Sequence, residues 1–180
     1  PETVLEMPID LKPYHLKYDN YDLIIIGYQP WFLSPSQPTT ALFKDINFTQ
    51  VLKNTPIVTV IGSRNMWISS QKSIIKWIAE AGGKLIANVP FIDEHQNNIS
   101  VLTMLHWMLT GKKNKKWGIL PLPGVTESNI NAAKLLGEPV FHSLMEEDFS
   151  QTQASILALG RPHILLPSVL TESTAKKIFI

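Results

Sequence analysis

The sequence contains no cysteine among its 180 residues. This absence excludes disulfide bonds, thiolate nucleophiles and metal sites with cysteine ligands. The five histidines show no paired spacing of metal ligands, so metal chemistry is not indicated. No apolar run reaches the roughly 18 residues of a membrane-spanning helix. The opening residues Pro1-Glu2-Thr3 are not a signal peptide, and we expect a cytoplasmic protein without a membrane span.

The sequence also lacks an excess of charge of either sign. Lysine and arginine number 16, aspartate and glutamate 15, and the formal net charge is +1. The one basic cluster, Lys112–Lys116, is short and more typical of a solvated loop than of a phosphate-binding patch. We therefore expect no nucleic-acid partner.

Two apolar runs that each end in glycine are the most informative feature that is present. Residues Asp22–Gly27 and Pro56–Gly62 are continuous and rich in β-branched side chains. This pattern predicts strands buried on both faces of a parallel sheet. Residues Lys84–Val89 form a third run of this kind.

Further elements are expected around these strands. A helix is predicted over Thr40–Lys53, and a second is capped by Ser69 or Ser70 and stopped by Gly82-Gly83. The remaining expected elements are a strand over Thr3–Ile9, a helix from Asn97 or Asn98 to Gly111, a helix from Thr126 to Gly137 and an edge strand over Glu138–Phe141.

The alternation of strands and helices predicts an α/β fold, a three-layer doubly wound parallel sheet. We expect one main domain over residues 1–145. Residues 146–180 are expected to form a C-terminal segment that covers the core or a partner surface, because Ser155–Leu159 and Ile164–Leu170 are apolar but broken by glycine and proline.

Each of the first two strands runs into an aromatic-rich loop, and these loops are expected to face each other at the carboxyl edge of the sheet. Trp31, Phe32 and Trp67 can supply flat apolar surface for a flavin ring, and backbone N–H groups near Gly62 can bond its polar edge. Arg64 can place a cation beside the reduced flavin. Packing of these aromatics in the core and a surface ion pair of Arg64 are the open alternatives.

At these loops the sequence resembles the flavodoxin-like FMN proteins, and more closely a bacterial group of dialkylresorcinol condensing enzymes. The stretches that carry the resemblance are DLIIIGYQPWFLSPSQPTTAL at Asp22–Leu42, TPIVTVIGSRNMW at Thr55–Trp67 and, more weakly, LPLPGV at Leu120–Val125. The resemblance implies strand order 2-1-3-4-5 and FMN as the cofactor. The implied cofactor-binding residues are Pro30, Trp31, Phe32, Leu33 and Ser34 in one loop and Gly62, Ser63, Arg64, Asn65, Met66 and Trp67 in the other. The cation that Arg64 can place beside the reduced flavin makes this residue the candidate catalytic residue.

One part of the flavodoxin-like pattern is not found. These proteins hold the FMN phosphate in a Ser/Thr/Gly-rich loop after the first strand, and nothing in Pro1–Asn20 resembles that loop. If Thr3–Ile9 is the second strand, the first βα unit is absent from this chain. Weak binding of FMN is then expected, because charge-assisted contacts to the phosphate are strong.

The sequence therefore favours an FMN-dependent oxidoreductase that transfers hydride through flavin N5 to or from a small organic substrate or a nicotinamide. The narrower resemblance implies an alkyl-substituted cyclic diketone or resorcinol substrate and a separate ketosynthase in the same pathway; a homo-oligomer is also compatible. A flavodoxin-type electron carrier is the nearest alternative, although carriers need an acidic docking surface. A non-catalytic binding or assembly module is the other alternative. Asp93, Glu94 and His95 are weaker acid–base candidates, with a helix cap or solvated loop the simpler interpretation.

Overall fold

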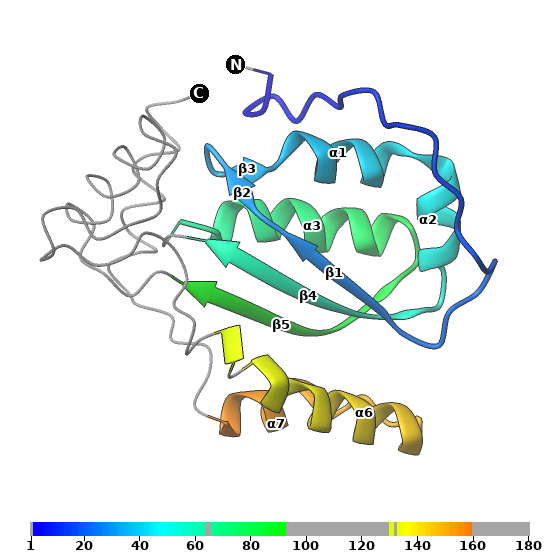
Figure 1. The fold of residues 1–180 in the computed structure, drawn as a ribbon, viewed down its shortest axis with the longest axis vertical. Coiled ribbons are helices and arrows are strands. Elements are labelled where there is room, and N and C mark those ends of the chain that lie inside the picture. Colours follow the sequence, from blue (N-terminus) through cyan, green and yellow to red (C-terminus); the bar gives the residue numbers. More distant parts are fainter. Residues whose placement is uncertain (1, 64–65, 93–129, 132, 160–180) are drawn as a thin grey trace, which may run out of the picture.

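The computed structural model describes residues 2–63, 66–92, 130–131 and 133–159. Several expected features lie outside these residues: the helix from Asn97 or Asn98 to Gly111, the basic cluster, the start of the helix at Thr126, and the stretch Ile164–Leu170. The described residues form a mixed α/β structure with helices packed on both faces of a sheet (Figure 1).

The sheet has three parallel strands in the order β1-β4-β5. Strand β1 is Ile24–Tyr28, β4 is Pro56–Ser63 and β5 is Lys84–Ile92. Ile24 pairs with Ile57 of β4, and Thr59 of β4 pairs with Asn88 of β5. The prediction of three neighbouring parallel strands at these positions is confirmed. The wider order 2-1-3-4-5 is not tested by this part of the chain.

Helices α1 (Gln37–Lys44) and α2 (Ile46–Leu52) connect β1 to β4. The single helix expected over Thr40–Lys53 is wrong because the backbone is extended at Asp45, with φ −85° and ψ 125°. The Asp45 carboxylate accepts a hydrogen bond from the Asn47 backbone N–H at 2.7 Å and so caps α2. A polar residue that prefers a cap thus divides the expected helix in two.

Helix α3 (Ile68–Glu80) connects β4 to β5. Its cap at Ser69 or Ser70 was predicted wrongly, since the N-cap residue is Trp67 and the helix starts before both serines. Its predicted end is confirmed: Gly82 has φ +76°, a conformation that glycine adopts without strain. Both connections run over the same face of the sheet, as expected when consecutive crossovers have the same hand (Figure 1).

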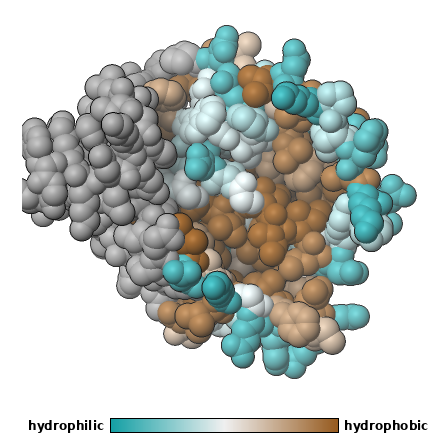
Figure 2. Space-filling view, in the orientation of Figure 1, coloured by the Kyte–Doolittle hydropathy of each residue, from teal (hydrophilic) through white to brown (hydrophobic). Residues whose placement is uncertain are grey.

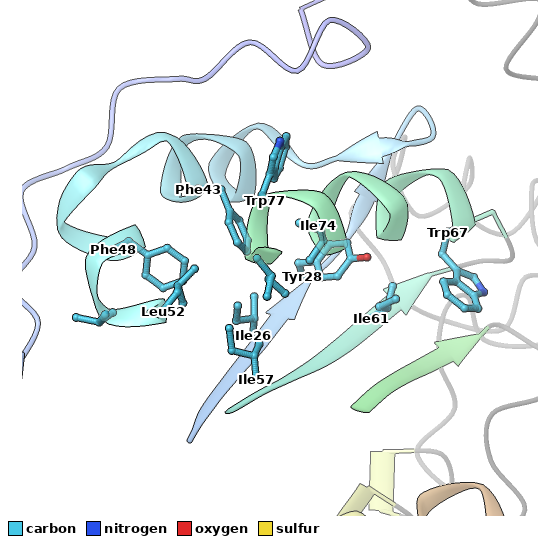
Figure 3. Packing of buried hydrophobic residues seen from close by; sticks show 12 residues of the cluster. Ile26, Tyr28, Phe43, Phe48, Leu52, Ile57, Ile61, Trp67, Ile74 and Trp77 are labelled. Atoms are coloured by element: carbon cyan, nitrogen blue, oxygen red, sulfur yellow. The ribbon is translucent and has the colours of Figure 1, made fainter. Parts of the chain in front are cut away.

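The larger core cluster lies between the sheet and helices α1, α2 and α3. Aromatic rings fill it, with Phe43 and Phe48 edge-to-face at 5.4 Å between ring centroids and Phe43 at 5.5 Å from Trp77. Figure 3 shows these rings against the isoleucines of the strands and α3. The fully buried members of this cluster are Leu52, Ile57, Ile61, Ile74 and Ile78.

A second, mainly aliphatic cluster lies on the opposite face, under the 3-10 helix η2 (Ala133–Leu136) and helices α6 (Gly137–Glu146) and α7 (Thr152–Ala158). Here the predicted edge strand Glu138–Phe141 and the predicted helix end at Gly137 are wrong, because α6 begins at Gly137. Pro139 lies in the first turn of α6, where a missing N–H breaks no helical bond. Within Ser155–Leu159, Ile156 is fully buried in this cluster, whereas Leu157 and Leu159 are exposed, so the covering role of this stretch stays a prediction. The proposed boundary between residues 145 and 146 stays a prediction.

Strand β1 departs from its predicted burial on both faces. It is at the edge of the three-stranded sheet, and Ile25 is 60% exposed while Ile26 is buried. The reason is that α1, α2 and α3 cover only one face of β1 in the described structure. Figure 2 shows hydrophobic side chains gathered in a hollow on the side of the molecule where β1 lies in front.

The expected strand over Thr3–Ile9 is also wrong. Residues 2–6 form turns in which Glu6 N–H donates to the Thr3 carbonyl and Met7 N–H to the Glu2 carbonyl, both at 3.0 Å. The Ser73 hydroxyl on α3 donates to the Glu6 carboxylate. The N–H groups of Glu6 and Met7 and the Glu6 carboxylate thus have hydrogen-bond partners without a neighbouring strand. The segment runs along the helical layer and not in the sheet (Figure 1).

Candidate functional site

The first predicted loop is a tight hairpin. Strands β2 (Pro30–Trp31) and β3 (Ser34–Pro35) pair antiparallel, and Phe32 and Leu33 form the turn between them. Both turn residues have positive φ, 50° and 69°, the conformation of a type I′ turn. The Ser36 backbone N–H donates to the Gln29 carbonyl at 3.0 Å and closes the base of the hairpin. Bulky residues rarely adopt this conformation, so the turn is strained.

A cleft of about 650 Å³ opens at the carboxyl edge of the sheet, beside the base of this hairpin. It lies where ligand sites of open α/β sheets are found, and its volume is in the usual range for a small-molecule site. The strands contribute the end of β1, the end of β4 and the end of β5. Its lining residues are Gly27, Tyr28, Gln29, Ser36, Pro38, Thr39, Val60, Gly62, Phe91, Ile130 and Ala133.

Several residues of the cleft lining carry polar side chains. The Ser36 and Thr39 hydroxyls lie 2.8 Å apart in the first turn of α1, and one donates to the other. The Gln29 amide follows β1 and lies over Gly62, whose added Cβ would be 3.8 Å from Gln29 Cγ. Val60, Phe91 and Ile130 are among the apolar residues of the lining. The cleft therefore combines an apolar surface with hydroxyl and amide groups, as small-molecule sites do.

The second predicted loop contributes less to this cleft. Gly62 lines it, whereas Trp67 is only 5% exposed and packs in the core cluster below α3 (Figure 3). Ser63 and Met66 are half-buried and are not among the lining residues. Arg64 and Asn65 lie outside the described residues, so the catalytic role of Arg64 stays a prediction.

The first loop lies beside the cleft and not in its lining. Trp31 is 41% and Phe32 66% exposed, while Leu33 and Ser34 are buried and Pro30 is half-buried. Gln29 and Ser36, which flank the hairpin, do line the cleft. Of the predicted site residues that are described, Gly62 alone is in the lining.

Sequence reasoning missed most of the lining residues. Ser36 and Thr39 carried a usable signal, although the predicted helix began only at Thr40: a serine followed three residues later by threonine places two hydroxyls in one turn when a helix starts between them. Ile130 and Ala133 carried none, because they reach the cleft only through the packing of η2 and α6 on the sheet.

Titratable groups with shifted pKa lie away from the cleft lining. Burial, followed by the nearby Asp45 carboxylate, raises the pKa of Tyr14 above its ordinary 10.0. The Ser150 backbone N–H, 2.9 Å from the carboxylate, lowers the pKa of Asp148. Among the described residues no group of three or more metal-binding side chains occurs, and none of the described helices is both long and apolar enough to cross a membrane.

Comparison of the chain with protein-family models, with curated proteins and with solved structures finds no match.

Proposed function

We propose that the cleft binds the ring system of a flavin, FMN, and that the chain is an FMN-dependent oxidoreductase acting on a small organic substrate. The observation that carries this proposal is the cleft itself, at the carboxyl ends of β1, β4 and β5. A flavin ring is flat and apolar with one polar edge, and it supplies hydride transfer when bound. These properties suit a lining that combines apolar residues, Phe91 and Val60 among them, with the polar residues Gln29, Ser36 and Thr39.

Different residues of the cleft would contact different parts of the flavin ring. The Gln29 amide offers both donor and acceptor to a polar ring edge, and the Ser36–Thr39 pair offers a hydroxyl hydrogen or lone pair. Phe91, at the end of β5, offers an aromatic edge or face. Trp67 packs in the core, so its proposed role becomes support of the helix start of α3 below the loop and not direct ring contact.

The same proposal extends to fold and partners. A flavodoxin-like sheet has a further parallel strand beside the strand equivalent to β1, and the position of β1 at the edge of the sheet that the described residues form supports pairing with such a βα unit. The resemblance adds the partners to this proposal. The substrate is a nicotinamide or an alkyl-substituted cyclic diketone, and a ketosynthase acts in the same pathway. The proposal also includes self-association of the chain and a cytoplasmic location.

A matched pair of variants tests the cleft. Gly27→Val adds a β-branched side chain at a lining position where an added Cβ meets no described atom within 4 Å, so the strand is kept and cleft space is filled. Ile25→Val, two residues earlier on the same face of β1, is the control because Ile25 is not in the lining. Titration with FMN, followed by flavin fluorescence, is expected to show weaker binding for Gly27→Val and unchanged binding for the control. Equal affinities for both variants and the unaltered chain, or no binding at all, would contradict the proposal.

A non-catalytic binding module is the second candidate, and the exposed hairpin tip supports it. Trp31 and Phe32 present two aromatic side chains on a strained turn, an arrangement suited to contact with another protein. A flavodoxin-type carrier is disfavoured by the net charge of +1. Flavin absorption in the purified protein separates both redox functions from the binding module. Consumption of a reduced nicotinamide with a small quinone or diketone then separates the enzyme from the carrier.

A further inference from the structure

Four side chains form a chain of hydrogen bonds across the core side of the sheet. The Tyr28 hydroxyl donates to Gln71 Oε1 at 2.6 Å, and Gln71 Nε2 donates to Thr59 Oγ1 at 3.1 Å. The Thr59 hydroxyl then donates to Asn88 Oδ1 at 2.9 Å. We call Tyr28, Gln71, Thr59 and Asn88 the polar chain.

Three members of the polar chain are buried, Asn88 is half-buried, and the hydrogen bonds all run in one direction. Thr59 is fully buried, Gln71 is 4% exposed and Tyr28 is 5% exposed. Each hydroxyl donates onward, and the Gln71 amide presents its oxygen to Tyr28 and its nitrogen to Thr59. Buried chains of this kind specify one arrangement of the elements that carry them, because any other arrangement leaves a polar group without a partner.

The polar chain joins elements that form the cleft. Tyr28 is the last residue of β1, and with its neighbours Gly27 and Gln29 it lines the cleft. Gln71 is on α3, and Thr59 is in β4 one residue before the lining residue Val60. Asn88 is in β5, where its backbone N–H donates to the Gln153 side chain of α7 at 2.7 Å. The hydrogen bond between Tyr28 and Gln71 therefore ties the carboxyl end of the edge strand to the interior of the fold.

The Tyr28 ring also packs in the core, and its hydroxyl is directed to Gln71. Figure 3 shows the Tyr28 ring beside Ile74 with its hydroxyl directed along the sheet and away from the Phe43–Trp77 end of the core. Among the described residues, β4 is the one strand that pairs with β1, so the contact of Tyr28 with α3 adds a second support to the end of this strand, beside the hydrogen bond from the Ser36 N–H to the Gln29 carbonyl.

We propose that Gln71 is a positioning residue for the cleft: through its hydrogen bond to Tyr28 it sets the position of Gly27–Gln29, and with it the affinity for the flavin ring. This inference rests on the proposed function for its ligand. A positioning role differs from a purely structural one in that it changes ligand affinity even when the protein remains folded.

The test uses Gln71→Met, which keeps the length of the side chain and removes both hydrogen bonds, and Tyr28→Phe, which removes a single oxygen atom. Ile74→Val, one turn along α3 and fully buried, is the control for general destabilisation of the same core. Titrations with FMN are made well below the lowest unfolding temperature of the set. Both polar-chain variants are expected to bind FMN about 2- to 10-fold more weakly, the equivalent of one net hydrogen bond, and Ile74→Val within 2-fold of the unaltered chain.

Backbone amide exchange at Gly27–Gln29, measured without ligand, separates failure of this inference from failure of the proposed function. Faster exchange there in Gln71→Met and Tyr28→Phe, but not in Ile74→Val, supports the positioning role even if the unaltered chain does not bind FMN. Unchanged exchange at these residues in both polar-chain variants, or affinity equal to that of Ile74→Val, would overturn it.

Discussion

Strands β1 and β4 have closely similar sequences and lie side by side, yet their surroundings differ. In β4, Ile57, Val58 and Thr59 are all buried, with helices on both faces. In β1, Ile25 is exposed and Ile26 is buried, so the strand alternates. A run of β-branched residues therefore indicates that a strand is suited to burial on both faces, but the position of the strand in the sheet decides whether both faces are covered.

The largest expected effect comes from truncating isoleucine in each strand. Ile57→Ala removes a fully buried side chain from β4, and we expect unfolding free energy to fall by about 2–5 kcal/mol. Ile25→Ala in β1 is expected to change it by about 0.5 kcal/mol or less, because the side chain is already largely in water. Urea unfolding measures both, and a loss in β1 comparable to that in β4 would show that Ile25 is covered in solution.

The room for an added side chain also differs between the two strands, as the glycines Gly83 and Gly27 show. A Cβ added at Gly83, beside the start of β4, would lie 2.6 Å from Ile57 Cδ1 and 3.0 Å from the Leu52 carbonyl oxygen. Gly83→Ala is therefore expected to cost about 1–3 kcal/mol of unfolding free energy through overpacking. Gly27→Ala in β1 meets no described atom within 4 Å and is expected to be neutral or slightly stabilising. Thermal unfolding of the pair is the measurement; similar melting temperatures would contradict the difference in packing.

Removal of the Thr59 hydroxyl from β4 is expected to have a smaller effect on the free energy of unfolding. Thr59→Val keeps the shape of the side chain but leaves Gln71 Nε2 and Asn88 Oδ1 without their shared partner. We expect a loss of about 1–2 kcal/mol. Thr49→Val on α2 is the control, because the Thr49 hydroxyl bonds only to nearby helix carbonyls in the described structure. Denaturant unfolding that ranks the two variants equally would show that the polar chain adds no stability to β4.

These strands also show how far the sequence predicts the molecule. The apolar runs correctly predict three parallel neighbours and an edge where a cleft forms, because strand pattern is a local property. The same local signal does not tell an aromatic in the core from one at a ligand: Trp67 packs below α3, while Phe32 is exposed on a hairpin. Ile130 joins the cleft from a distant part of the chain, and only tertiary packing brings it there.

The smallest expected effect is on the pH dependence of the free energy of unfolding, through Tyr14 and the Asp45 carboxylate in the connection between the two strands. Asp45 separates α1 from α2 on the path from β1 to β4, and burial together with this carboxylate raises the pKa of Tyr14 above 10.0. Because the folded state holds the Tyr14 proton more tightly than the unfolded state does, this contribution to stability is complete below pH 10 and is lost as pH rises through the raised pKa. Tyr14→Phe cannot ionise, so its unfolding free energy is expected to fall less than that of the unaltered chain between pH 9 and pH 11. The difference is expected to be under about 1 kcal/mol because the phenol is only partly buried. Urea unfolding of both proteins at these two pH values measures the difference. Equal losses of unfolding free energy in both proteins would show that ionisation of Tyr14 does not cause the loss of stability at high pH.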